Sequence, residues 1–205
     1  MSDNPHQQGA WLVQRIGKVT ASRVQDVISK TAKGKPTAAR QEYLMEIVTQ
    51  RMTGAQTQKF VNAAMQWGID QEAFARDEYQ RRTGNVVDLV GFIEHPELDA
   101  GASPDGLIGL DGGVEYKCPS PVRHAETILL GMSEDHKPQI QMQMWICDLS
   151  WVDFVSYDPR FPAEQSMYIQ RITRDDEYIE MLAIEVRNFL GEVVETINQL
   201  KERCK

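Results

Sequence analysis

The chain changes from helix-forming to strand-forming composition at Gly84. Before this residue, apolar side chains recur at helical spacing, and after it come short runs of strand-forming residues bounded by Pro, Asp and Gly. We expect strands over 86–94, 99–103, 106–110, 114–118, 150–157 and 166–172. We expect later helices near 121–131 and 137–148, and a final one after Thr173. This order predicts an α/β fold in which helices flank a central mixed β-sheet.

Four helices are expected before Gly84. Trp11, Leu12 and Ile16 are spaced for one helix face, and Thr20 is placed to cap a second helix that ends at Ile28. A third helix opens at residues 34–36 and ends at Gly54, and a fourth runs over 59–83. No repeat and no linker divides the sequence, so we expect one domain over residues 1–205.

The charge of the chain is unevenly distributed. The 205 residues carry a formal charge of −8, but residues 1–60 hold nine basic and four acidic side chains, and residues 92–115 hold six acids and no Lys or Arg. The total argues against a surface that is basic all over, and leaves room for a local basic path on the first 60 residues. No apolar run approaches the ~20 residues of a membrane span. The three widely spaced cysteines and the N-terminus without a signal segment predict a reduced, cytoplasmic protein.

The residues most typical of an active site lie in two segments, Ser103-Pro104-Asp105-Gly106 and Glu115-Tyr116-Lys117. Alternate residues of a strand share a face, so Glu115 and Lys117 project together while Tyr116 turns away and offers its backbone carbonyl. We expect a hairpin turn at residues 111–113 to fold Asp105 back beside them. Two carboxylates and a lysine then converge, which suits Mg²⁺ or Mn²⁺ and the activation of water.

These residues match the PD-(D/E)xK nuclease signature, and the wider pattern resembles the bacteriophage lambda exonuclease family of phage alkaline exonucleases, including YqaJ-like viral recombinases. The matching segments are residues 11–22, 67–72, 103–107, 115–119, 139–145 and 157–160. The resemblance implies a restriction-endonuclease-like core. We further expect residues 1–60 to contact DNA, residues 61–172 to form the catalytic core and residues 173–205 to form a C-terminal helix.

The resemblance implies a role for each site residue. Asp105, Glu115 and the Tyr116 carbonyl would bind metal, with Glu72 completing a site for two Mg²⁺ ions, or Mn²⁺, and Lys117 would activate water. A pocket for a 5′-terminal phosphate would be formed by Arg15, Ser22, Ser103 and Gln139. Met65 would be an apolar wedge where the DNA strands separate.

Three further expectations come from the residues themselves. The basic loop at residues 29–35 makes Lys33 and Lys35 candidate contacts to the DNA backbone. Gln139 and Gln141 lie two apart on an expected helix, so at most one of them reaches the site. Cys118 has no histidine partner placed by sequence, so we interpret it as a buried thiol rather than a nucleophile.

By resemblance, the activity is Mg²⁺-dependent 5′ to 3′ digestion of linear double-stranded DNA from a 5′-phosphorylated end. The products would be mononucleotides and a 3′-ended single strand for phage-type recombination in a bacterial or phage-infected cell. The resemblance further implies a homotrimer and a single-strand annealing protein as partner.

Three alternatives remain open. The first is a structure-specific endonuclease of the same superfamily, and the second is a non-catalytic DNA-end-binding recombination accessory protein. The joint presence of Asp105, Glu115 and Lys117 argues against the second. The third is a CRISPR-associated nuclease with an iron–sulfur cluster, which three scattered cysteines do not favour.

Overall fold

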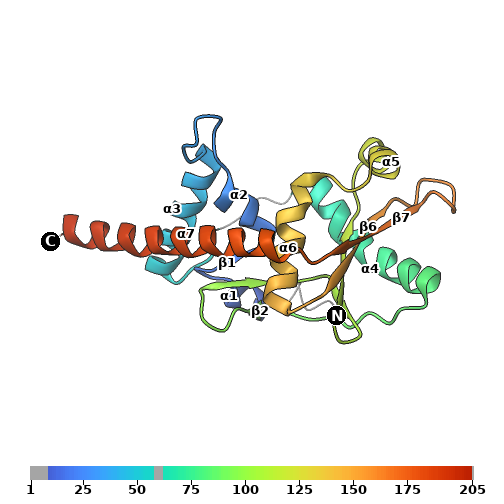
Figure 1. The fold of residues 1–205 in the computed structure, drawn as a ribbon, viewed down its shortest axis with the longest axis horizontal. Helices are drawn as coiled ribbons and strands as arrows, with labels where there is room; N and C mark the ends of the chain where they lie inside the picture. Colours follow the sequence, from blue (N-terminus) through green and yellow to red (C-terminus); the bar gives the residue numbers. More distant parts are fainter. Residues whose placement is uncertain (1–8, 58–61, 205) are drawn as a thin grey trace.

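The computed structural model describes residues 9–57 and 62–204 (Figure 1). Its helices and 3-10 turns are α1 (Gly9–Gln14), η2 (Ala21–Arg23), α2 (Val24–Ile28), α3 (Ala38–Thr53), α4 (Ala63–Thr83), α5 (Pro121–Leu130), η3 (Glu134–His136), α6 (Lys137–Cys147) and α7 (Asp176–Arg203). Its strands are β1 (Val19–Thr20), β2 (Ile93–Glu94), β3 (Ala100–Ala102), β4 (Gly106–Ile108), β5 (Gly112–Lys117), β6 (Trp151–Tyr157) and β7 (Met167–Thr173). The predicted α/β fold is confirmed.

The helix ends follow from local chemistry. Gly54 and Gly84 end α3 and α4 with φ of 65° and 74°, a left-handed conformation that glycine adopts without steric cost. At the start of α3, the Thr37 side chain accepts a hydrogen bond from the Arg40 backbone N–H. Thr20 is different: its side chain makes no capping hydrogen bond, so the predicted cap is wrong. The first helix also stops at Gln14, before Ile16.

Hydrogen bonding divides the strands into two sheets. The larger has the order β4-β5-β6-β7, and the smaller has the order β1-β3-β2. In the larger sheet β5 and β6 run parallel while the outer pairs are antiparallel, so the sheet is mixed as predicted. The expected strand over 86–94 is shorter than predicted, because within it strand pairing is confined to β2 and an isolated bridge between Asp88 and Leu107.

The hairpin between β4 and β5 turns earlier than predicted. Gly109 takes the left-handed conformation at φ 62°, while Gly112 and Gly113 lie inside β5. A Cβ atom on Gly112 would overlap the Trp151 ring, and one on Gly113 would lie 2.8 Å from Leu149. These two glycines are therefore explained by close packing against the β6 region rather than by a turn. The antiparallel return that brings Asp105 beside β5 is nevertheless present.

The larger sheet lies between two helices. On one face, Tyr79 of α4 packs with Tyr116 and Val155; on the other face, Ile140 of α6 packs with Phe154. The helix α6 is covered in turn by α7, which also packs on α2 and α3 (Figure 1). Because α6 is buried from both sides, its polar residues are held in fixed directions. No helix within the described residues has both the length and the apolar character needed to cross a membrane.

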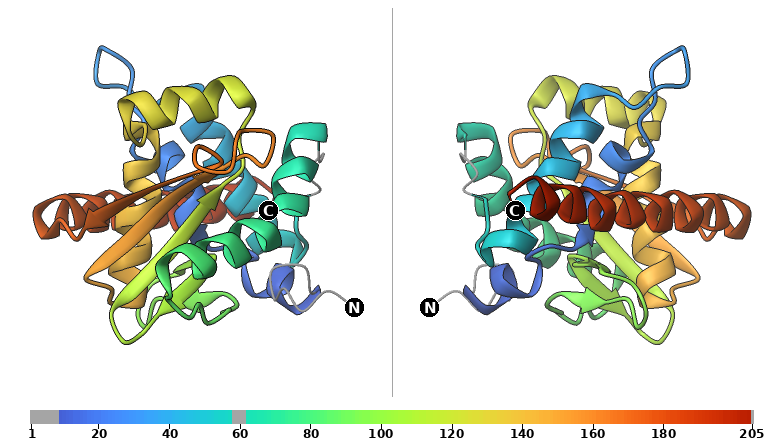
Figure 2. Two further views of the ribbon diagram at one scale, coloured as in Figure 1. Left: turned by 90° about the vertical axis from the view of Figure 1, so that its right-hand side faces the viewer. Right: turned by 90° about the vertical axis from the view of Figure 1, so that its left-hand side faces the viewer.

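The basic loop joins α2 to α3. In Figure 2 it projects from the body of the molecule. Lys33 and Lys35 are exposed on it, while Lys30 forms a salt bridge of 2.6 Å with Glu185 of α7. The loop is thus fixed at its base and presents its two other lysines to solvent.

Candidate active site

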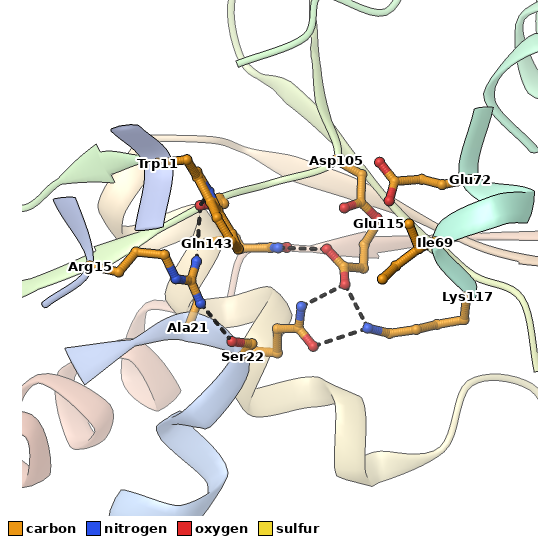
Figure 3. Close-up of a pocket in the computed structure, with 12 residues that line it drawn as sticks. Trp11, Arg15, Ala21, Ser22, Ile69, Glu72, Asp105, Glu115, Lys117 and Gln143 are labelled. Atoms are coloured by element: carbon orange, nitrogen blue, oxygen red, sulfur yellow. Dashed lines mark hydrogen bonds and ion pairs between the residues drawn. The ribbon is translucent and has the colours of Figure 1, made fainter. Parts of the chain in front are cut away.

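One pocket of about 480 Å³ brings together side chains from distant parts of the chain (Figure 3). It is lined by Trp11, Arg15, Ala21, Ser22, Ile69, Glu72, Ser103, Asp105, Glu115, Lys117, Gln139 and Gln143. Eight of the predicted site residues are in this set. In Figure 3 the acidic residues and Lys117 gather at one side of the pocket, and Trp11, Arg15 and Ser22 lie at the other.

The strand β5 places the acid and the lysine on one face. Glu115 and Lys117 both point toward α6, and the Lys117 Nζ atom donates to Glu115 Oε1 at 2.6 Å. Tyr116 points to the opposite face, where its ring meets that of Tyr79 edge-on at 6.0 Å. Its backbone N–H donates to Asp105 Oδ2 at 2.7 Å, which fixes Asp105 against the strand. The predicted alternation along β5 is therefore confirmed.

Glu115 is nearly buried and accepts hydrogen bonds at both oxygens. Besides Lys117, Gln139 donates to Oε1 at 2.5 Å and Gln143 donates to Oε2 at 2.7 Å. A carboxylate in such a position needs donors, because burying a charge without them is costly. Gln143 was not among the residues predicted for the site. Its spacing of four residues from Gln139 could have identified it, because residues four apart lie on the same face of α6.

Glu72 and Asp105 bring further negative charge to the site. Figure 3 shows the Glu72 carboxylate directed from α4 toward Asp105. Burial, together with the neighbouring Glu115 and Glu72 carboxylates, raises the pKa of Asp105 well above its usual range. Ionised carboxylates so close together repel one another, and a divalent cation between them relieves that repulsion. A hard cation such as Mg²⁺ also prefers oxygen ligands, which the acids and a backbone carbonyl supply here. In residues 9–57 and 62–204, no group of three or more His, Cys, Asp or Glu side chains could hold a metal ion by itself.

The lysine remains charged in this environment. Burial alone would lower the pKa of Lys117, but the Glu115 and Asp105 carboxylates raise it above the ordinary value. The adjacent Cys118 has the opposite character, since burial raises the pKa of its thiol to about 12. A thiol of such low acidity is not an activated nucleophile, in agreement with the interpretation from sequence.

The other side of the pocket is basic and rich in hydroxyl groups. Arg15 donates to Ser103 Oγ at 3.2 Å and to Ser22 Oγ at 3.4 Å, and its guanidinium lies 4.3 Å from the centre of the Trp11 ring. Trp11 itself donates to Ser103 Oγ at 2.9 Å. These three neighbours carry no negative charge, and burial lowers the pKa of Arg15. The cluster therefore has the donors and the charge to bind an anion such as phosphate.

Three of the predicted residues, Met65, Lys33 and Lys35, lie outside the pocket, and Gln139 lies inside it with partners other than those expected. Gln139 lines the pocket, but its amide contacts Glu115 and Lys117 rather than Arg15. Met65 is half-exposed in the first turn of α4 and does not line the pocket. Lys33 and Lys35 stand outside it on the projecting loop.

Gln141 lies on the same helix as Gln139 and turns away from the site. Its side chain bonds the backbone of Thr173 and Asp175. The prediction that at most one of Gln139 and Gln141 reaches the site is therefore confirmed.

Comparisons with known proteins agree on a family. The model of the YqaJ-like viral recombinase domain matches residues 10–150. Among solved structures, the alkaline exonuclease LHK-Exo from Laribacter hongkongensis is 43% identical, with a TM-score of 0.89 over 96% of this chain and 98% of that chain. That protein has also been solved in complex with dAMP. No match was found among the curated proteins.

A more distant structure supports the fold. A phage-related exonuclease from Haemophilus somnus 129PT is 16% identical and superposes with a TM-score of 0.65 over 92% of this chain and 96% of that chain. The resemblance drawn from the sequence motifs and the restriction-endonuclease-like fold are both confirmed. The chain belongs to the YqaJ-like viral recombinase family of phage-type alkaline exonucleases, and its general role is that of a nuclease in recombination.

Proposed function

We propose that the protein is a divalent-cation-dependent exonuclease that digests linear double-stranded DNA in the 5′ to 3′ direction from a 5′-phosphorylated end. This proposal rests on one observation: Arg15 and the Glu115–Lys117 pair line the same pocket. Its volume of about 480 Å³ lies in the range of pockets that enclose one small ligand. A terminal nucleotide can thus bind with its 5′-phosphate on the basic side and its 3′-phosphodiester on the acidic side.

The acidic side would hold two Mg²⁺ ions, or Mn²⁺, through Asp105, Glu115, Glu72 and the Tyr116 carbonyl. When bound, such cations supply positive charge that stabilises the pentavalent phosphate and the departing 3′-oxygen. Glu115 and Asp105 hold this position, since each is anchored by protein hydrogen bonds. Lys117 lies on the acidic side beside Glu115 and donates hydrogen bonds to water and to phosphate oxygen, which orients the attack.

The basic side would select the DNA end. The Arg15 guanidinium and the hydroxyls of Ser22 and Ser103 bind the terminal phosphate, a set of donors that a 5′-hydroxyl end cannot use. Gln139, whose amide contacts Glu115 and Lys117, is assigned to the same phosphate pocket. Each cycle breaks the bond between phosphorus and the 3′-oxygen, so it releases a 5′-mononucleotide and leaves a new 5′-phosphate for the next cycle.

Other parts of the chain complete the proposal. Residues 1–60 contact DNA, with Lys33 and Lys35 on its backbone, residues 61–172 form the catalytic core, and residues 173–205 form the C-terminal helix. Met65 is assigned as the wedge between the strands. The dAMP complex of LHK-Exo, a relative with 43% identity, supports a deoxynucleoside monophosphate as product. The family resemblance supports a homotrimer that acts with a single-strand annealing protein in the cytoplasm.

The direction of digestion is tested with the same duplex labelled at the 5′ end or at the 3′ end in separate preparations. A 5′-phosphorylated linear duplex carries ³²P at its 5′ phosphate or, in a second preparation, a fluorophore at its 3′ end. We expect early release of ³²P as mononucleotide while the 3′ label stays on long strands. Early release of the 3′ label as mononucleotide would refute the proposed direction, and early appearance of either label on shortened long fragments would indicate an endonuclease.

A further inference from the structure

Two amide side chains of α6 hold Glu115 from the same side. Gln139 and Gln143 are one helical turn apart, and they donate to different oxygens of this carboxylate, Oε1 and Oε2 (Figure 3 shows the second contact). Gln143 is fully buried. Its neighbours Met142 and Met144 belong to different parts of the core, one facing α7 and the other facing β6. The helix is therefore packed on both sides, which holds Gln143 directed toward Glu115.

The hydrogen bonds leave Glu115 with one acceptor direction open. A carboxylate has about four lone-pair directions, two on each oxygen. Lys117 and Gln139 both donate to Oε1, whereas Gln143 alone among the described residues donates to Oε2. The remaining direction is therefore on Oε2, and Gln143 determines where it points.

The oxygen atom of the Gln143 amide, Oε1, is a second feature of this side chain. Because Glu115 is an acceptor, Nε2 must face it, and Oε1 is directed elsewhere. That oxygen is buried, and no described residue donates to it. A buried acceptor without a donor is destabilising, so Oε1 is available to a water molecule in the pocket.

We infer that Gln143 is a positioning residue that turns Glu115 Oε2 toward the divalent cation and thereby sets the affinity of the site for it. This inference rests on the proposed function, in which Glu115 is a metal ligand. Residues that orient a metal ligand typically change metal affinity or activity by about 10 to 100-fold when they are replaced. Gln143 would act in this way without touching the cation or the DNA.

The test compares two buried glutamines of the same helix. Gln143→Met keeps the length of the side chain and removes its amide. Gln141→Met is the matched control, because Gln141 is equally buried and bonds Thr173 and Asp175 outside the pocket. Binding of Mn²⁺ to the full chain is measured by titration calorimetry, and kcat and KM for linear DNA are measured over a range of Mg²⁺ concentrations.

We expect Gln143→Met to bind Mn²⁺ about 10 to 100-fold more weakly and to need correspondingly more Mg²⁺ for half-maximal kcat, with an unchanged KM for DNA. Gln141→Met should match the wild type in these three readouts. If Gln143→Met does not fold, Gln143→Asn replaces it, since this variant keeps a buried amide that is too short to reach Oε2. Wild-type Mn²⁺ affinity in the folded variant would overturn the inference.

Glu115→Gln separates this inference from the proposed function. If Glu115→Gln still binds Mn²⁺ and cleaves DNA, the assignment of Glu115 as a ligand is wrong and the proposed metal site fails. If Glu115→Gln loses both while Gln143→Met retains both, the metal site stands and the positioning role of Gln143 is refuted.

Discussion

The ammonium nitrogen of Lys117 lies 2.6 Å from Oε1 of Glu115, the residue two positions earlier on the same strand. The side chain of Glu115 is 5% exposed and that of Lys117 is 29% exposed, so this pair is unlike the exposed salt bridges that contribute little to stability. Lys117 occupies one oxygen and leaves Oε2 as the oxygen with an open direction. A lysine and a cation can therefore share the same carboxylate.

Replacement of Lys117 tests the catalytic role of this pair. Lys117→Ala should lower kcat on linear duplex DNA by about 10²–10³-fold, because it removes a charged donor that orients water and stabilises charge on the phosphate. DNA binding, measured by fluorescence anisotropy in Ca²⁺, should remain within a factor of a few. Lys137→Ala is the control, since Lys137 pairs with Asp175 outside the pocket. A near-native kcat for Lys117→Ala would show the assignment to be wrong.

Arg15 is expected to determine the preference for a 5′-phosphate. The wild type should degrade a 5′-phosphorylated duplex faster than a 5′-hydroxyl duplex. Arg15→Met should lower the ratio of these two rates by about 10 to 100-fold, because a hydrogen bond to a charged group contributes about 1.5–3 kcal/mol. Arg81→Met, a change at an exposed arginine of α4 that pairs with Glu78, is the control. An unchanged ratio in Arg15→Met would place phosphate recognition elsewhere.

The projecting loop predicts a salt-dependent interaction with DNA. Lys33→Ala combined with Lys35→Ala should weaken binding and reduce the slope of log Kd against log salt by about 0.9 for each DNA phosphate that a lysine no longer neutralises. Lys30→Ala should change the slope less, because Lys30 already pairs with Glu185. Equal slopes for the wild type and the double variant would exclude the loop from the interface.

Acid stability should depend on Glu78. Hydrogen bonds from Arg81 and Arg82 lower the pKa of Glu78 to about 2, and Arg82 also bonds Ser166, which ties α4 to the β6–β7 loop. A lowered pKa means that the stabilisation is complete above the unfolded value of 4.5 and is lost as the pH falls toward 2.

Glu78→Gln removes this dependence. Between pH 4.5 and 2, the free energy of unfolding of the wild type should fall more steeply than that of Glu78→Gln, by up to about 1 kcal/mol for such a partly exposed pair. Urea unfolding across this range measures the difference, with Glu126→Gln as a control on the exposed Arg123 pair. Parallel curves for wild type and Glu78→Gln would contradict the prediction.

Much of the fold could be predicted from local signals. Gly54 and Gly84 end helices because they adopt positive φ, and the alternation along β5 separates Tyr116 from Glu115 and Lys117. The turn between β4 and β5 was predicted at the wrong position, because a Gly-Gly pair is compatible with either a tight turn or a close neighbour. Here the neighbours Trp151 and Leu149, which lie far along the chain, determined the outcome.

The site was less predictable from spacing alone. Arg15 and Ser103 are 88 positions apart, so their hydrogen bond follows from the tertiary fold and was expected from family resemblance. Gln143 was missed because it lies between two buried methionines, a pattern typical of core packing. Its position one turn from Gln139 was the signal that it faces the same carboxylate.

The central claim is tested most directly by one digestion with purified protein. A 5′-phosphorylated linear duplex and a covalently closed circle of the same sequence are incubated together with Mg²⁺, and a parallel sample contains EDTA. We predict that the linear DNA is converted to mononucleotides and single strands in Mg²⁺, that the circle stays intact, and that EDTA stops the reaction. Rapid loss of the circle, or full activity in EDTA, would contradict the account.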